Sequence, residues 1–354
     1  MVHLSSLGQQ TSFGAHASSR RRLAAGTVTV LCLFLFLQLF LPQSDALVPS
    51  TSNWRGSVPS DNHWQVPRHK YAFATFLAAP AEELESDDDD RYYVMSRMMA
   101  YQVLHDPLTR TREAYPFVVL VSEDVRQSKR ERLARDGAVV VPVKRITSDW
   151  LKTKNPKWRD MLSKLRLFEL TQYDKVAYFD SDTVIVQNLD EIFNDEAAVV
   201  TPNLGNPKEA PEDEGKQPSQ YIFAGNAGAG GFDHAWPPPP NRKNLNGGCF
   251  VYKPSQDMFD YYMRVVNIKD RFEIKYMEQN LLAYVHRREG NMPWKQIHYK
   301  WNTNWATFND TLRGVASLHT KFWENEHDPQ LRDICMRSRW QMEGYWNRAD
   351  LDGA

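Results

Sequence analysis

A short apolar run that ends in two carboxylates constrains the fold of this chain more than any other stretch. Residues 176–179 (Val-Ala-Tyr-Phe) have the pattern of a buried strand, and residues 180–182 (Asp-Ser-Asp) follow at once. A second strand-like run follows at 183–186, and residues 188–193 predict a capped helical turn. Two carboxylates at the end of a buried strand are costly unless a cation meets them. The stretch therefore predicts a strand end that binds a cation.

A divalent metal ion is the cation that suits Asp180 and Asp182. Hard ions such as Mg²⁺ and Mn²⁺ take oxygen ligands, usually a few carboxylates together with phosphates of a substrate. In open α/β sheets, ligands gather at the carboxyl ends of the strands, where this pair is expected to lie. The alternative is an ordinary Asp-rich turn, because Asp and Ser are common turn residues.

Strand and helix patterns alternate through the first half of the chain. Asp87 to Asp90 follow a polar stretch and no apolar strand, so they predict a solvated loop or a helix entry. The alternation predicts an α/β fold with a doubly wound, mostly parallel sheet. The expected strands are 69–77, 117–121, 138–143 and 249–252, and the expected helices are 91–104, 126–135, 158–170 and 276–284.

The N-terminal region has the pattern of a membrane anchor. Residues 23–41 contain 19 residues without a charge, and three arginines directly precede them. This length crosses a bilayer as a helix, and the arginines place residues 1–22 in the cytosol and the rest in the lumen. A signal peptide cleaved near Ala46 is the alternative. We favour the anchor because the run exceeds the usual apolar core of a signal peptide, about 7–15 residues.

The composition leaves room for one large domain and excludes some classes of partner. The chain has 354 residues and a formal net charge of −1, so there is no broad electrostatic case for nucleic acid. Its three cysteines fall far short of a disulfide scaffold, and pairing of Cys249 with Cys335 stays open. The expected parts after the anchor are a stem at 42–67, a catalytic domain at 68–330 and a C-terminal tail at 331–354.

Four sequence blocks stand in a recognisable order and cover about 160 residues. They are SKLRLFELTQYDKVAYFDSDTVIVQNLDEIF (163–193), NGGCFVYKPS (246–255), EQNLL (278–282) and HTKFW (319–323). Together they resemble glycosyltransferase family 8, the glycogenin-like enzymes, and suggest a fungal-type Golgi member. Two positions depart from the family pattern, because Glu278 replaces an aspartate and Phe322 replaces a proline after a shortened spacing.

The resemblance implies a fold, a cofactor and a set of site residues. The implied fold is a single domain of the Rossmann-like GT-A architecture, and the implied cofactor is Mn²⁺, with Mg²⁺ as an alternative. Implied metal ligands are Asp180, Asp182 and His319. Implied catalytic residues are Asp180, Asp182, Glu278 and Gln279, and implied substrate-binding residues are Lys164, Ser181, Asn246, Gly247, Gly248 and Lys321.

The implied activity is transfer of a sugar from a UDP-sugar to a glycan or glycoprotein acceptor, with retention of configuration. The sugar, whether N-acetylglucosamine, glucose, galactose or glucuronic acid, stays open. Retention would use Glu278 as a nucleophile or proceed by same-face attack of the acceptor. The implied location is the Golgi membrane, with the catalytic domain in the lumen. A catalytically silent carbohydrate-binding protein and a sugar-nucleotide hydrolase are the alternatives.

Residues 203–242 depart most from a compact enzyme core, because they are rich in Gly, Pro, Ala and Asn. A long loop without secondary structure inside a domain is usually a lid, a binding loop or a disordered segment. The glycines at 225–231 lack the Lys-Ser/Thr of a phosphate-binding loop, so we reject a phosphate cradle there. We expect an acceptor-side loop, with a plain insertion as the alternative.

Overall fold

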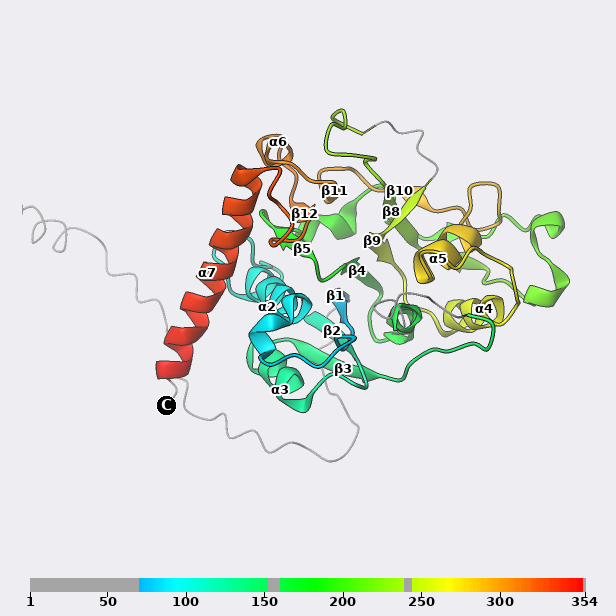
Figure 1. Ribbon diagram of the computed structural model, residues 1–354. Helices are drawn as coiled ribbons and strands as arrows, with labels where there is room; N and C mark the ends of the chain where they lie inside the picture. The colour runs from blue at the N-terminus through cyan, green and yellow to red at the C-terminus, as the bar shows by residue number, and fades with distance from the viewer. Residues whose placement is uncertain (1–69, 152–159, 239–243, 353–354) are drawn as a thin grey trace, which may run out of the picture. The chain divides into compact units, whose positions relative to one another are not determined.

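The computed structural model describes residues 70–151, 160–238 and 244–352, all of which belong to one compact unit (Figure 1). The expected cytosolic tail, the membrane anchor at 23–41 and the stem at 42–67 lie outside these ranges. Within the described ranges, no helix combines the length and the apolar character that crossing a membrane requires.

A seven-stranded sheet forms the centre of the domain, with the strand order β10-β8-β9-β4-β1-β2-β3. β1 pairs in parallel with β2 and β4, β2 pairs in parallel with β3, and β10 pairs in parallel with β8. Only β9 runs antiparallel to its neighbours among these described strands. The expected α/β fold with a mostly parallel sheet is confirmed. The bounds are β1 Tyr71–Leu77, β2 Phe117–Ser122, β3 Val139–Val143, β4 Lys175–Phe179, β8 Phe223–Ala227, β9 Leu245–Tyr252 and β10 Lys295–Gln296.

Helices cover both faces of this sheet, which explains the continuous apolar runs in its strands. All six residues of β2 are buried, because side chains pointing to either face meet a core. α2 (Arg91–Leu104) and α3 (Gln127–Arg135) pack on one face, and α4 (Gln256–Val266), α5 (Glu278–Val285) and the 3₁₀ helix η3 (Met161–Glu169) pack on the other (Figure 1).

The acidic run at 87–90 starts a helix, as expected. Asp87–Asp89 form the short 3₁₀ helix η1, and Asp90 is the N-cap of α2, where its side chain accepts a hydrogen bond from the Tyr93 amide at 3.2 Å. Lys129 of α3 lies 2.7 Å from the other oxygen of Asp90. Both carboxylate oxygens of Asp90 are thus satisfied within the fold.

A second, smaller sheet brings the C-terminal part of the chain next to the Asp-Ser-Asp turn. Its order is β11 (Thr303–Asn304), β12 (Ser317–His319) and β5 (Thr183–Ile185). β12 runs antiparallel to β5, so that His319 lies opposite Thr183. Because Thr183 directly follows the turn, this register carries His319 to it.

The expectation of a long structureless loop at 203–242 is wrong for much of its described part. The segment contains the 3₁₀ helices η5 (Pro207–Glu209) and η6 (Glu212–Glu214), then β7 (Gln220–Tyr221) and the buried β8. β7 pairs with β6 (Thr201–Pro202). Small residues let β8 approach β9 closely, since a Cβ at Gly225 would lie 3.0 Å from the Leu245 side chain.

Most of the expected C-terminal tail forms a long helix. α7 (Pro329–Asp352) packs against α2, as Figure 1 shows, and α6 (Phe308–Leu312) lies near its start. Its buried residues, Leu331, Cys335, Met342 and Trp346, are spaced by four, seven and four, which places them on one helical face. The expected helix at 158–170 is described from 160 onward and is 3₁₀ in character. Cys249 and Cys335 are both free thiols.

Candidate active site

Backbone hydrogen bonds join the three segments that meet at the carboxyl end of β4. The amide of Asp180 donates to the carbonyl of Gly248 at 2.8 Å, which continues the β4–β9 pairing by one residue. The carbonyl of Asp182 accepts from the amide of Thr320 at 2.9 Å, directly after the end of β12. The positions of these residues are therefore set by main-chain pairing.

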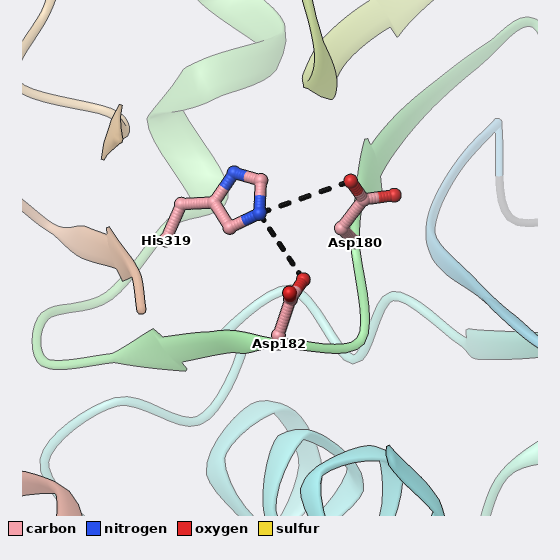
Figure 2. A group of neighbouring side chains, drawn as sticks. All are labelled: Asp180, Asp182 and His319. Carbon is pink, nitrogen blue, oxygen red and sulfur yellow. Dashed lines mark ion pairs between the residues drawn. The ribbon is translucent and has the colours of Figure 1, made fainter. Parts of the chain in front are cut away.

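The side chains of Asp180, Asp182 and His319 converge on one another (Figure 2). His319 Nε2 lies 3.1 Å from Asp182 Oδ1 and 3.8 Å from Asp180 Oδ2. One candidate ligand atom from each residue lies within 4.8 Å of the others. A donor set of two carboxylate oxygens and one imidazole nitrogen suits Mn²⁺, and the oxygens alone suit Mg²⁺. The residues present fit the expected cofactor.

The charges within this group depend on one another. Burial alone would lower the pKa of His319, but Asp182 and Asp180 together outweigh burial and raise that pKa above its usual value. Burial would likewise raise the pKa of Asp182, but His319 lowers it below the usual value. A metal ion would replace the imidazolium as the partner of the carboxylates, since a ligand histidine must be neutral.

Gly248 is needed for His319 to sit in this place. A Cβ at position 248 would lie 2.2 Å from His319 Cε1 and 2.4 Å from His319 Nδ1, closer than any side chain tolerates. Its neighbour Gly247 donates its amide to Gln279 Oε1 at 2.8 Å, and Asn246 Oδ1 accepts from the Gly248 amide at 2.9 Å. The Asn-Gly-Gly block thus brings β9 close to both His319 and α5.

Lys164 lies between two carboxylates, on the buried side of the site. Its Nζ atom is 2.8 Å from Asp180 Oδ1 and 2.7 Å from Glu278 Oε1. Burial would lower the pKa of Lys164, but Asp180 and Glu278 raise it above its usual value. Burial raises the pKa of Glu278, and Lys164 offsets only part of this. The Tyr178 hydroxyl also donates to Asp180 Oδ1, at 2.5 Å. Asp180 therefore keeps Oδ2 facing His319.

The remaining expected residues lie around an open cleft with a volume of about 840 Å³. Asn246, Gln279 and Lys321 line it together with Asp182 and His319. Ser181, the middle residue of the turn, is buried and does not line the cleft. Lys321 Nζ lies 3.4 Å from Glu324 Oε2. Two of the expected metal ligands, Asp182 and His319, thus line the cleft. Lys164, which contacts Asp180, and Glu278 are buried and do not line it.

Sequence reasoning did not select two groups that the structure places here. One is Tyr178, whose position in a buried strand predicts core packing and gives no signal for its hydrogen bond to Asp180. The other is a set of aromatic residues on the cleft, Phe232, Tyr276 and Trp305. Trp305 ends the stretch 301–305, which the sequence predicts to be strand and turn near the acceptor face, with no role for any single residue.

Comparisons with known proteins place the chain among glycosyltransferase homologues. An uncharacterized protein of Schizosaccharomyces pombe is 29% identical over 296 residues, or 74% of this chain and 75% of that protein. Galactinol synthase 6 of Arabidopsis thaliana is 27% identical over 140 residues (39% of this chain, 38% of that protein), and mouse glycogenin-1 is 25% identical over 175 residues (48% and 42%). The chain thus spans less than half the length of either of these two named relatives.

No protein-family model matches the chain. Among solved structures, the galactosyltransferase LgtC in complex with donor and acceptor sugar analogs is similar, with a TM-score of 0.41 and 13% identity over 72% of this chain and 90% of that one. The two named relatives are glycosyltransferases of the kind that the sequence blocks resemble. The chain is a homologue of glycosyltransferases.

Proposed function

We propose that this protein is a retaining, metal-dependent glycosyltransferase of the GT-A architecture. It moves a sugar from a UDP-sugar to a glycan or glycoprotein acceptor. The observation that carries the proposal is the convergence of Asp180, Asp182 and His319 beside an open cleft. Homology to named glycosyltransferases supports the reaction class.

Asp180 Oδ2, Asp182 Oδ1 and His319 Nε2 would hold Mn²⁺, or Mg²⁺ in its place. The ion would neutralise the charge that develops on the UDP leaving group. Lys164 has a separate task in this proposal. By holding Asp180 Oδ1 at 2.8 Å, the buried ammonium fixes the direction of Oδ2.

The structure favours retention of configuration by attack of the acceptor on the sugar from the same face as the leaving group. A double displacement needs a free carboxylate nucleophile. Glu278 is the candidate from the sequence, but it is buried, its pKa is raised by burial, and Lys164 Nζ lies 2.7 Å from its Oε1. We therefore propose that the acceptor oxygen bonds to the sugar as the bond to UDP breaks. The hydroxyl proton passes to the leaving diphosphate.

The proposed location is the Golgi membrane, as a single-pass enzyme of fungal type with a luminal catalytic domain. The uncharged run at 23–41 and the preceding arginines support it. Cleavage near Ala46 is the alternative. Alkaline carbonate extraction of membranes distinguishes the two, because an anchored protein stays in the pellet and a cleaved one is released.

The test of the activity is UDP release from a panel of UDP-sugars. The full chain is incubated with UDP-glucose, UDP-galactose, UDP-N-acetylglucosamine or UDP-glucuronic acid, with Mn²⁺, with Mg²⁺ or with a chelator. We expect release from one donor, dependent on metal and increased by an acceptor. Metal-independent release, or no binding of UDP with Mn²⁺, would contradict the proposal. Release that no acceptor increases would indicate a hydrolase.

A further inference from the structure

Three large aromatic side chains line the cleft. Phe232, Tyr276 and Trp305, which we call the aromatic wall, are 44%, 46% and 48% exposed, and all three line the cleft that holds Asp182 and His319. Large apolar side chains that stay exposed inside a concave site are typical of ligand-binding surfaces.

Contacts within the protein hold the aromatic wall in place. The Phe232 ring meets the Trp305 ring edge-on, at 5.0 Å between centroids and 84° between planes, and its centroid is 3.8 Å from the His327 ring. Asn304 Oδ1 accepts from the amide of Ala229 at 2.7 Å, which ties the Trp305 segment to the glycine-rich segment after β8. Trp305 itself has a φ of +56°, a backbone conformation that residues with side chains seldom adopt and that clusters at functional sites.

Three amide side chains along the cleft share one arrangement. The side-chain oxygens of Asn246, Gln279 and Asn304 each accept a hydrogen bond from a backbone amide, at 2.9, 2.8 and 2.7 Å. Among the described residues, none accepts a hydrogen bond from their NH₂ groups. These side chains are therefore oriented by the fold and keep donors for oxygen atoms of a ligand.

The charges on this part of the cleft cancel. Away from the three candidate metal ligands, its charged residues are Lys321 and Glu324, which form an ion pair at 3.4 Å. A charged ligand finds no uncompensated partner among the described residues there. A ligand with an apolar face and several hydroxyl groups matches both the exposed rings and the NH₂ donors.

We propose that the aromatic wall is the acceptor subsite and binds a neutral pyranose. The sugar ring stacks on the Trp305 indole, and the edge-on contact with Phe232 holds that indole in position. The inference rests on the proposed function, because it takes the part of the cleft at Asp182 and His319 as the donor site. It goes further by naming a neutral sugar unit, and not a charged sugar or a peptide, as the group that docks next to the metal site.

Saturation-transfer NMR on the full chain tests this subsite. The protein is purified in a detergent without a sugar headgroup. The probes are methyl α-D-glucopyranoside, methyl β-D-galactopyranoside and methyl α-D-mannopyranoside, with glucuronate as the charged comparison. Trp305→Ala removes the stacking surface and Trp305→Phe keeps an aromatic face. Trp340→Ala removes another exposed tryptophan, 62% exposed, on α7 and outside the cleft. Thermal melting checks that each variant is folded.

We expect at least one neutral glycoside to receive saturation from wild type and from Trp340→Ala, with a fivefold or larger loss in Trp305→Ala. Trp305→Phe should keep more than half of the signal, and glucuronate should receive less than the neutral probes. The inference is overturned if no neutral glycoside binds wild type, or if folded Trp305→Ala binds as wild type does. Calorimetry of UDP with Mn²⁺ on wild type separates the two proposals. UDP binding without glycoside binding would contradict the acceptor subsite alone. Glycoside binding without UDP binding would contradict the proposed function.

Discussion

Two acidic segments of this chain, Asp87–Asp90 and Asp180–Asp182, differ in what surrounds their carboxylates. In the first, Asp90 caps α2 and pairs with Lys129, and Asp87 lies 3.6 Å from the same lysine. In the second, the close charged partner of both Asp180 Oδ2 and Asp182 Oδ1 is the imidazole of His319, at 3.8 and 3.1 Å.

A high density of carboxylates therefore does not by itself indicate a candidate metal site. The first segment has more aspartates, but the fold itself supplies their cations and amide donors. The second follows an apolar strand, so its carboxylates arrive at a sheet edge where the chain offers a histidine and an open cleft. An acidic group whose oxygens are already satisfied by lysine and by backbone amides has little affinity left for an added ion.

The largest effect should come from removing one charge of the second segment. Asp182→Asn keeps the shape of the side chain but removes a metal ligand, so we expect metal-dependent UDP release to fall by about a thousandfold or more. Asp88→Asn, in the exposed part of the first segment, is the matched control and should leave turnover unchanged. Equal turnover in both variants would remove the distinction between the segments.

The next effect should fall on stability and come from the first segment. Asp90→Ala removes the cap of α2 and leaves the buried Lys129 without its close partner, and Asp90 and Lys129 are only 5% and 3% exposed. We expect the free energy of unfolding to fall by about 3 kcal/mol or more, measured by urea denaturation. UDP and Mn²⁺ binding by the folded fraction should persist. A loss of binding in folded protein would give this segment a role in the site.

Added Mn²⁺ should stabilise the native state through the second acidic segment only. This stabilisation should be smaller than the loss expected for Asp90→Ala. At a free Mn²⁺ concentration about 100 times its dissociation constant, binding to the native state alone stabilises it by about 2.7 kcal/mol. We expect thermal melting of wild type and of Asp88→Asn to rise with Mn²⁺ and with UDP, and melting of Asp182→Asn to stay constant. An equal rise in all three proteins would place the ion elsewhere.

The smallest expected effect is on Mn²⁺ affinity, and it comes from a variant that leaves both carboxylates unchanged. Gly248→Ala puts a methyl group where His319 lies, at 2.2 Å from Cε1, so the imidazole must move. We expect Mn²⁺ affinity, measured by calorimetry, to fall by about 10- to 100-fold, as for other changes next to a metal ligand. Gly344→Ala is the control, because nothing lies within 4 Å of its new methyl group. Unchanged affinity in Gly248→Ala would show that His319 is not a ligand.

Much of the N-terminal half of the fold could be predicted because its signals are local. The bounds of α2 match the expectation, since Asp90 caps a segment with regularly spaced apolar residues. β1 and β2 are likewise continuous apolar runs. The Asp-Ser-Asp turn could be placed at a strand end for the same reason, whereas His319 is implied as a ligand only through the resemblance of the block at 319–323 to the family.

The missed features depend on distant partners. β8, with the sequence Phe-Ala-Gly-Asn-Ala, has little intrinsic strand preference and forms because β9 pairs with it. Charged residues are frequent in α7, so the regular spacing of its four buried residues gives only a weak helical pattern. The ion pair of Lys164 with Glu278 joins residues more than a hundred positions apart, and no local pattern predicts it.

The backbone hydrogen bond from Thr320 to Asp182 has a consequence for the biosynthesis of the protein. Asp182 leaves the ribosome roughly 140 residues before His319, which corresponds to about 7–28 s at ordinary rates of translation. Until β12 has been made and has paired with β5, a nascent chain offers an ion two carboxylates and no histidine. Under the proposed function, any truncated product that ends before residue 319 lacks one of the three proposed metal ligands, and we expect premature termination to yield inactive chains.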